Sequence, residues 1–422
     1  MLLAFLFISL FIMLTIGVPV GFAIGGATIA SMLLYTNLDV SMIANYCISG
    51  IDSFTMMAIP FFILSGTVMS VGGLARRLID VAACLVGWIT GGLGAVVALS
   101  SMFFGAISGS SMATVSSIGS IMVPQMVNKG YDKGYAAVYT ACAGTVGAVI
   151  PPSIPFVVYG VATSTSVGDL FMAGIFPGIL IGIGMIIGNV IICKKNGYTA
   201  KMEKPTFKQA MKCIWDAKWA LLSPVIILGG IYSGVFTPTE ASVVAVMYSA
   251  VVALLIYREI TIRQLYDAIV RTAVVNGITT FLLGLSTGFA ALLSLQRVPS
   301  QLCDWMVNLT DSKFLFLLIV NIVLLIIGCF MDNIPATIVM GPMLLPAMEA
   351  FGVNAVSLGV LMSVNLLVGL VTPPYGCSLF VASAICQVSM KDMLKHIGVP
   401  LTILIICVMI ITYVPWFTTW FM

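Results

Sequence analysis

The sequence carries very little charge for its length. Only 8% of its 422 residues are Asp, Glu, Lys or Arg, whereas soluble globular domains contain about 25%. With 60% hydrophobic residues and a mean hydropathy of +1.15, the chain cannot cover a surface that faces water. This composition excludes a soluble enzyme, a disulfide-rich secreted scaffold, a disordered chain and a nucleic-acid-binding protein. It predicts an all-α polytopic membrane protein in a lipid bilayer.

Residues for metal and redox chemistry are also scarce. His396 is the only histidine, which excludes a multi-histidine metal site or a histidine proton relay. The 10 cysteines are scattered without a CxxC pair, so we expect them to act as small hydrophobic residues in helix packing. No feature of the sequence predicts an enzyme.

The apolar segments are numerous, but many are short or interrupted by glycine and proline. Non-helical backbone at membrane depth survives only where protein or a water-filled cavity satisfies its polar groups. The interruptions are therefore as informative as the spans. The expected apolar segments are 2–16, 18–35, 54–71, 88–107, 112–127, 136–163, 170–193, 219–236, 241–257, 272–295, 314–330, 336–350, 356–385 and 399–421.

The distribution of charge predicts the orientation of the chain. Residues 194–218 are rich in lysine and are expected to be cytoplasmic by the positive-inside rule. The arginines at 258, 263 and 271 return the chain to that side two spans later. The turn between these spans begins at Thr237, which together with Glu240 forms the pattern of a helix capping box.

An internal repeat relates the two halves of the chain. Residues 110–152 align without a gap with 332–374, and both segments contain a double proline near the end. The surrounding charges place the two copies in opposite orientations. Inverted repeats with matched interruptions are typical of secondary transporters, whose binding site lies where the interruptions meet. The identical positions include Gly119 and Gly341, Pro124 and Pro346, Gly147 and Gly369, and Pro151–Pro152 and Pro373–Pro374.

Each repeat contains two interruptions, one small and polar and one with a double proline. The first pair lies near 108–111 and 149–153, and the second near 331–335 and 371–376. A double proline frees carbonyl groups at the negative end of the upstream half-helix. These carbonyls, facing serine or asparagine oxygens, predict an oxygen cage for a hard cation in each repeat.

The downstream half-helices present N–H groups and positive dipole ends, which suit a carboxylate. No Lys or Arg lies in any interruption, so bound cations, hydroxyls and N–H groups would have to hold an anionic substrate. Asp332 is either a functional buried acid or the cap of the following half-helix. The candidate substrate residues are Ser108, Gly109, Ser153, Asp332, Thr372 and Tyr375.

Together these motifs resemble the large membrane subunit (M subunit) of TRAP transporters, the tripartite ATP-independent periplasmic transporters, most of all those of the sialic-acid type. The resemblance covers the whole chain. It rests on Ser108–Ser111, on Pro151–Ser153, on the sequence GVFTPTEA at 234–241, on Met331–Pro335 and on Thr372–Gly376.

The resemblance implies an inverted-repeat elevator transporter with two re-entrant hairpins and two broken helices, similar to the divalent-anion/sodium symporters. It implies coupling to two or more sodium ions and uptake of a small organic anion, with sialic acid first and a C4-dicarboxylate or another sugar acid as alternatives. By position it assigns one Na+ site to Ser110, Ser111, Val149 and Pro151, and the other to Gly328, Asn333, Val371 and Pro373. Related symporters carry Asn where this chain has Ser111.

The family also implies a small four-helix Q subunit and a soluble periplasmic binding protein, which we expect as separate chains at a bacterial inner membrane. The expected organisation is 1–72 as scaffold, 73–193 as an arm and the first transport half, 194–218 as a cytoplasmic linker, 219–295 as the second scaffold part, and 296–422 as the second arm, the second transport half and the last helix. The expected arms are 76–87 and 299–310, and residues 202–215 are expected to form an amphipathic helix.

Other functions remain open at this stage. A membrane channel would need a pore-lining filter motif, an intramembrane protease would need a catalytic partner other than His396, and an ATP-driven permease would need a separate ATPase subunit. A sodium/anion symporter that works without a binding protein is a further alternative. Sodium-dependent, saturable flux favours a symporter over a channel.

Overall fold

The computed structural model describes residues 1–36, 39–198, 203–373 and 376–422, and this part of the chain is helical without a β-strand. The first elements are α1 (Leu2–Thr15), α2 (Val20–Tyr35), α3 (Val40–Ile51), the 3-10 helix η1 (Phe54–Met57) and α4 (Ala58–Val71). They are followed by α5 (Leu74–Val86), α6 (Gly92–Ser108), α7 (Ser111–Asn128), α8 (Lys133–Val146), α9 (Ile154–Thr163) and α10 (Val167–Asn196).

The second half of the chain repeats this order after a short helix, α11 (Phe207–Asp216). Its first elements are α12 (Lys218–Tyr232), α13 (Pro238–Val251), the π-helix η2 (Val252–Ile256) and α14 (Ile262–Leu295). They are followed by α15 (Val298–Leu309), α16 (Lys313–Phe330), α17 (Asn333–Ala350), α18 (Ala355–Gly369), α19 (Cys377–Cys386), α20 (Met390–Leu394), α21 (Gly398–Tyr413) and α22 (Trp416–Thr419).

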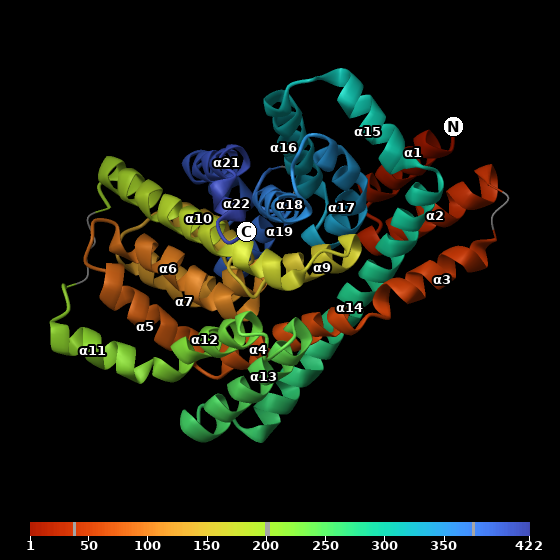
Figure 1. Cartoon of the computed structure of the whole chain (residues 1–422). Coiled ribbons are helices and arrows are strands. Elements are labelled where there is room, and N and C mark those ends of the chain that lie inside the picture. The colour runs from red at the N-terminus through yellow and green to blue at the C-terminus, as the bar shows by residue number, and fades with distance from the viewer. Residues whose placement is uncertain (37–38, 199–202, 374–375) are drawn as a thin grey trace.

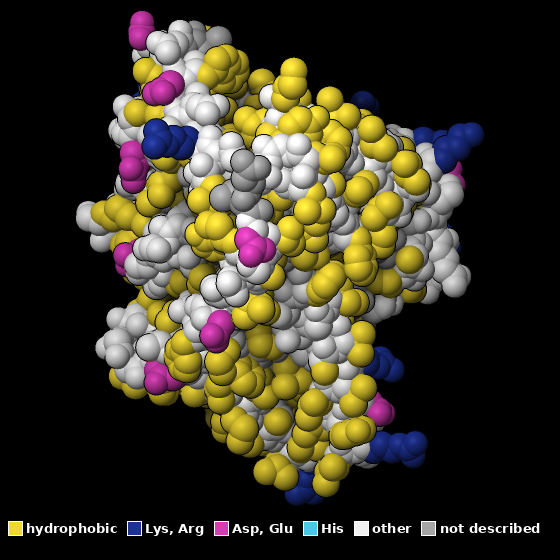
Figure 2. Space-filling view, turned by 90° about the vertical axis from the view of Figure 1, so that its right-hand side faces the viewer, with side chains coloured by type: hydrophobic (Ala, Val, Ile, Leu, Met, Phe, Trp, Pro, Cys, Tyr) yellow, Lys and Arg dark blue, Asp and Glu magenta, His cyan; other side chains and the backbone are white. Residues whose placement is uncertain are grey.

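The molecule has the character of an integral membrane protein. In the described part of the chain, 5 helical stretches are long and apolar enough to cross a bilayer, or 6 if α11 and α12, bent by 59°, count as one span. Figure 2 shows hydrophobic side chains across the visible face, with most of its acidic side chains along one edge and most of its Lys and Arg along the opposite edge. This separation agrees with the charge asymmetry expected across a membrane.

The two hairpins are formed by α6 with α7 and by α16 with α17. The first hairpin turns at Gly109, whose φ of 61° is left-handed, and Ser110 caps α7 by accepting a hydrogen bond from the N–H of Ala113 at 3.4 Å. The second turns at Met331 and Asp332, and Asp332 accepts a hydrogen bond from the N–H of Asn333 at 2.7 Å. Both tips therefore lie where the sequence interrupts its apolar runs.

The two broken helices are α8 with α9 and α18 with α19. Between α8 and α9, Ser153 caps α9, accepting a hydrogen bond from the N–H of Phe156 at 3.4 Å and donating one to the carbonyl of Ala148 at 2.5 Å. Between α18 and α19, Gly376 adopts a left-handed φ of 57° immediately before α19. The breaks fall at the double prolines, whose missing N–H groups prevent a continuous helix.

Each hairpin packs on its broken helix through a pair of glycines. A Cβ on Gly105 would lie 2.0 Å from the Cα of Gly147, and a Cβ on Gly369 would lie 2.5 Å from the Cα of Gly328. Only hydrogen fits at such distances, so the backbones of α6 and α8, and those of α16 and α18, meet directly. Small residues permit this kind of close helix crossing in membranes.

The helices α2, α3, α4 and α13 gather around the long helix α14 and its neighbours. The helix α14 packs against α2, α3 and α4 and also against α17 of the second hairpin, and α13 packs on α4. In Figure 1, α14 runs diagonally beside α3 along one edge of the molecule. The helix α14 thus links the helices outside the repeat to a hairpin tip.

Three sequence-based expectations need correction. The helix α14 begins at Ile262 rather than at 272, because the capping box of Thr261 and Gln264 starts it in the charged segment before the span. The helix α3 was not expected, although Asp39 caps it through the N–H of Ser41 at 2.9 Å. The linker helix begins at Phe207 instead of near 202, a position outside the described residues.

The capping box predicted at the turn before α13 is confirmed. Glu240 accepts hydrogen bonds from the N–H and hydroxyl of Thr237 at 2.8 and 2.9 Å. The helix α13 begins with Pro238 in its first turn, where the missing N–H costs nothing.

We predict that Gly105→Ala and Gly369→Ala each destabilise the protein by about 1–3 kcal/mol, as is typical of overpacking. The added methyl group would have to push two backbones apart. The matched control is Gly229→Ala in α12, where a Cβ meets nothing within 4 Å. Thermal unfolding in detergent micelles measures the effect, and equal midpoints for Gly105→Ala and Gly229→Ala would contradict the close crossing.

Candidate functional site

The tip of the first hairpin lies directly on the loop of the first broken helix. The carbonyl of Gly109 accepts a hydrogen bond from the N–H of Ile154 at 3.2 Å. A Cβ on Gly109 would lie 2.6 Å from the carbonyl oxygen of Pro152. The tip therefore requires glycine both for its left-handed backbone and for this close approach.

The loop between α8 and α9 carries carbonyl groups without partners. Among the described residues, none donates a hydrogen bond to the carbonyl oxygens of residues 149–152. The oxygen of Pro152 lies beside the hairpin tip, whereas that of Val149 lies toward α10, 3.0 Å from where a Cβ on Gly174 would be. Buried carbonyls without partners are unfavourable, so a ligand with positive charge would be stabilised beside them.

The hydroxyls of this tip have different roles. The Ser108 hydroxyl lies 3.4 Å from that of Thr114, and the Thr114 hydroxyl donates to the carbonyl of Ser110 at 2.8 Å. The Ser111 hydroxyl instead reaches across to the other repeat, 3.2 Å from the Oγ of Ser378 at the start of α19. Ser111 thus hydrogen-bonds the first tip to the second repeat.

The second tip meets the second broken helix in a similar way, with different side chains. The amide of Asn333 donates to the carbonyl of Ser363 at 3.4 Å, and its oxygen accepts from the hydroxyl of Thr337 at 3.1 Å. The thiol of Cys329 donates to the carbonyl of Thr372 at 3.2 Å. The carbonyl of Val371 receives no hydrogen bond from a described residue.

A cavity of about 440 Å³ brings the two tips together. Ser111, Ile154 and Asn333 line it, and each is the first residue of its helix, so three positive helix ends border one space. Asp332 carries the only formal charge among its described lining residues. The tip residues in the lining are Ser108, Gly109, Ser110, Ser111, Asp332 and Asn333.

The other predicted site residues with described positions are not part of the cavity lining. Gly328 is in the glycine contact with α18, and the hydroxyls of Ser153 and Thr372 are satisfied by backbone carbonyls. Tyr375 lies outside the described residues. The remaining predicted residues in the loops are Val149, Pro151, Val371 and Pro373.

Sequence reasoning missed the residues that close the cavity from outside the tips. Thr67 of α4 and Val275 and Thr279 of α14 line its wall. Outside the lining, the Ser378 hydroxyl is hydrogen-bonded to that of Ser111. Thr67 and Thr279 could have been considered as candidates from the sequence because they place hydroxyls within otherwise apolar spans. Each hydroxyl donates to the carbonyl four residues earlier in its own helix, at 2.8 Å for Thr67 and 3.0 Å for Thr279. Their place in the cavity wall depends on contacts between distant helices, which spacing alone does not reveal.

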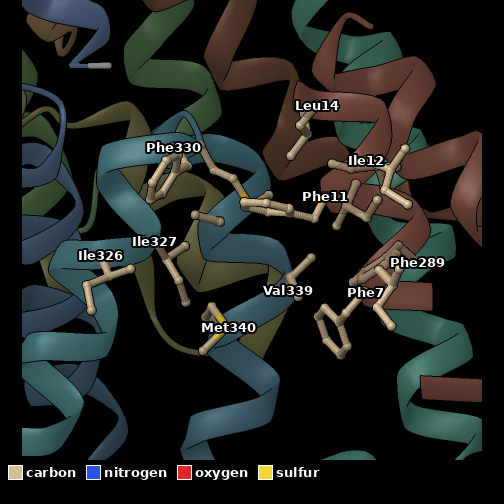
Figure 3. Close-up of a pocket in the computed structure, with 15 residues that line it drawn as sticks. Phe7, Phe11, Ile12, Leu14, Phe289, Ile326, Ile327, Phe330, Val339 and Met340 are labelled. Carbon is tan, nitrogen blue, oxygen red and sulfur yellow. The ribbon is translucent and has the colours of Figure 1, made fainter. Parts of the chain in front are cut away.

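A larger cavity of about 550 Å³ lies elsewhere and is not suited to an anion. It lies between α1 and the second hairpin, where Phe7, Phe11, Phe330, Val339 and Met340 converge without a charged or hydrogen-bonding side chain (Figure 3). A carboxylate placed there would lose its hydration without gaining a partner. The polar cavity between the tips is therefore the candidate site.

The role of Asp332 as a cap leads to a testable expectation. Asp332→Ala removes the oxygen that accepts from Asn333 and should lower stability by about 1 kcal/mol. Asp332→Asn keeps an oxygen there and should remain close to the unchanged protein. Thermal unfolding in sodium-free buffer compares the three proteins. If Asp332→Asn is as destabilised as Asp332→Ala, the charge itself and not the cap stabilises the tip.

Comparison with known proteins agrees with this architecture. Residues 7–417 match the family described as Tripartite ATP-independent periplasmic transporter, DctM component. The chain is 41% identical to the isethionate TRAP transporter permease protein DctMQ of Oleidesulfovibrio alaskensis, over 95% of this chain and 63% of that protein. It is 40% identical to the C4-dicarboxylate TRAP transporter large permease protein DctM of Pseudomonas aeruginosa, over 91% and 90% of the two chains.

A relative with a different named substrate and a solved structure extend this comparison. The sialic acid TRAP transporter large permease protein SiaM of Vibrio cholerae is 33% identical, over 95% of this chain and 94% of that protein. The YdaH transporter of Alcanivorax borkumensis, whose structure is described as having an unusual topology, has a TM-score of 0.65 at 14% identity and 90% coverage of both chains. At that identity the likeness concerns the fold alone.

Proposed function

Because the chain belongs to the family of DctM components of tripartite ATP-independent periplasmic transporters, we propose that it is the large permease of a sodium-coupled importer. Its cargo is a small organic anion, and its place is the bacterial inner membrane. A small membrane subunit and a periplasmic binding protein complete the system. The observation that carries the proposal is the single cavity bordered by both hairpin tips and three helix N-termini.

The oxygen atoms of the two tips and of the adjacent broken-helix loops are of the kind that bind sodium. Transporters bind sodium through unwound carbonyls and half-helix ends, and carbonyl oxygens can replace an ion's hydration shell. At the first tip, Ser110, Ser111 and the unpartnered carbonyl of Pro152 supply such oxygens, and the further unpartnered carbonyls of 149–151 lie in the same loop. At the second tip, Asn333 and the carbonyl of Val371 supply them. Bound sodium would provide positive charge in a region that lacks Lys and Arg.

The charge of the cavity favours an order of binding. Asp332 gives the described lining a negative formal charge, which attracts a cation and repels an anion at low effective dielectric. Sodium at the tips would offset that charge and add to the positive ends of α7, α9 and α17. A carboxylate would then find N–H groups and hydroxyls on several sides. Sodium therefore binds before the organic anion in this proposal.

The relatives suggest which anions to test. Their names specify isethionate, C4-dicarboxylates and sialic acid, and each of these compounds carries at least one carboxylate or sulfonate. The cavity contains hydroxyls at Thr67, Ser116 and Thr279 that could meet further polar groups of the cargo. Sialic acid, with its many hydroxyls, is the first candidate, and the other two classes are the comparison.

An elevator movement is the proposed mechanism of alternating access. The helices α5 and α15 directly precede the two hairpins, as arms that brace the surrounding helices against the moving part. The hairpins and broken helices would move as a unit, because the glycine contacts join them backbone to backbone. The helices α4 and α14 would stay fixed, and the hairpins and broken helices would move along them.

Uptake into proteoliposomes tests the proposal. The chain is reconstituted with its small subunit, a loaded binding protein is added, and an inward sodium gradient is applied or withheld. We expect uptake that requires both sodium and the binding protein. Ser111→Ala and Asn333→Ala should raise the half-saturating sodium concentration roughly tenfold, corresponding to about 1.4 kcal/mol of lost interaction.

Ser120→Ala is the matched control for these variants. Its hydroxyl lies on α7 as well, is exposed and donates to the carbonyl of Ser117 at 3.0 Å, so its uptake should equal that of the unchanged protein. Uptake that ignores sodium would refute the coupling, and uptake without the binding protein would favour a stand-alone symporter. Conductance that does not saturate would favour a channel.

A further inference from the structure

We propose that Ser378 is a positioning residue that couples the two sodium sites, so that occupation of one site favours occupation of the other. The inference rests on the proposed function, because it assigns a regulatory contact to the cation sites at the tips. It concerns a residue outside the predicted cages. Ser378 contacts the first tip with its side chain and closes the second loop with its backbone.

The side-chain contact crosses from one repeat to the other. The Oγ atoms of Ser111 and Ser378 are 3.2 Å apart, although 267 residues separate them in the sequence. Ser378 is fully buried at 0% exposure and Ser111 is 4% exposed. Ser111 lines the cavity, whereas Ser378 does not, so the Ser378 hydroxyl has no water to take over the hydrogen bond and would be left buried and unpaired if the contact were lost.

The backbone contact closes the loop of the second broken helix. The N–H of Ser378 donates to the carbonyl of Leu370 at 3.0 Å, which directly precedes Val371 of the second cation site. The same loop receives the thiol of Cys329, through the carbonyl of Thr372 at 3.2 Å. Thr372 is thus held by the second hairpin, and Ser378 is held by the first.

The contact has no counterpart in the first repeat. When the offset of 222 residues is continued beyond the aligned segments, Ser378 corresponds to Phe156, whose ring is buried against Gly174 of α10. At this position the first broken helix carries an aromatic ring and no hydroxyl. Packing symmetry does not require the Ser111–Ser378 link, and it is the one described side-chain hydrogen bond that joins a tip to the opposite broken helix.

This arrangement predicts cooperative sodium binding. Sodium at the first tip would fix Ser111 and, through it, Ser378 and the loop that carries Val371. The second site would then be formed before its own ion arrives, and the reverse holds for the other order. A neutral hydrogen bond of ordinary strength corresponds to a change in affinity of about two- to tenfold.

Sodium titration of the purified full-length chain tests the inference. The midpoint of thermal unfolding is followed as NaCl replaces choline chloride at constant ionic strength, so that only the identity of the cation changes. For the unchanged protein we expect a sigmoidal rise with a Hill coefficient above 1. Ser378→Ala should raise the half-saturating concentration about two- to tenfold and bring the Hill coefficient to 1. Ser378→Thr should restore both values.

Ser383→Ala is the matched control in the same half-helix. Its hydroxyl donates to the carbonyl of Val388 at 2.6 Å, away from both tips. We expect the variant to be less stable in choline and to keep the Hill coefficient of the unchanged protein. An unaltered Hill coefficient in Ser378→Ala, or the same loss in Ser383→Ala, would overturn the inference. A folded, unchanged protein without any sodium response would instead refute the proposed sodium coupling itself.

Discussion

In each repeat, the backbone of a hairpin helix touches the backbone of a broken helix at a pair of glycines, Gly105 with Gly147 and Gly328 with Gly369. This contact determines where each tip ends relative to the loop behind it. With a side chain at either position the helices would separate, and the tip would no longer reach the loop. The location of both candidate cation sites therefore depends on four positions that contribute no side-chain chemistry of their own.

The close crossing has an electrostatic consequence. It brings a hairpin tip to loops whose double prolines leave carbonyl oxygens without hydrogen-bond partners among the described residues. Such oxygens are unfavourable at membrane depth, and they are stabilised when a cation lies beside them. The same crossing directs the N-termini of α7, α9 and α17 toward one cavity. One packing constraint thus supports a cation site in each repeat and an anion site between them.

The features that follow from local chemistry could be predicted from the sequence. Proline lacks an N–H group, so the double prolines mark the breaks between α8 and α9 and between α18 and α19. Serine and aspartate cap helices, so Ser110, Ser153 and Asp332 mark the starts of α7, α9 and α17. The capping box of Thr237 and Glu240 is local in the same sense.

The features that depend on distant contacts could not be predicted. Ser378 meets Ser111 only because two helices of different repeats pack side by side. Thr279 borders the cavity because α14 lies against α17, a contact that no spacing in the sequence encodes. The early start of α14 at Ile262 was missed because charged residues usually end a span, whereas this helix extends from the apolar core into the charged segment.

Direct binding of radioactive sodium to the purified chain, measured without and with a candidate organic anion, tests the central claim most directly. The account predicts that sodium binds without the anion, that potassium and choline do not displace it at equal concentration, and that the anion is retained only when sodium is present. Retention of the anion in sodium-free buffer, or the absence of sodium binding to the folded protein, would contradict it.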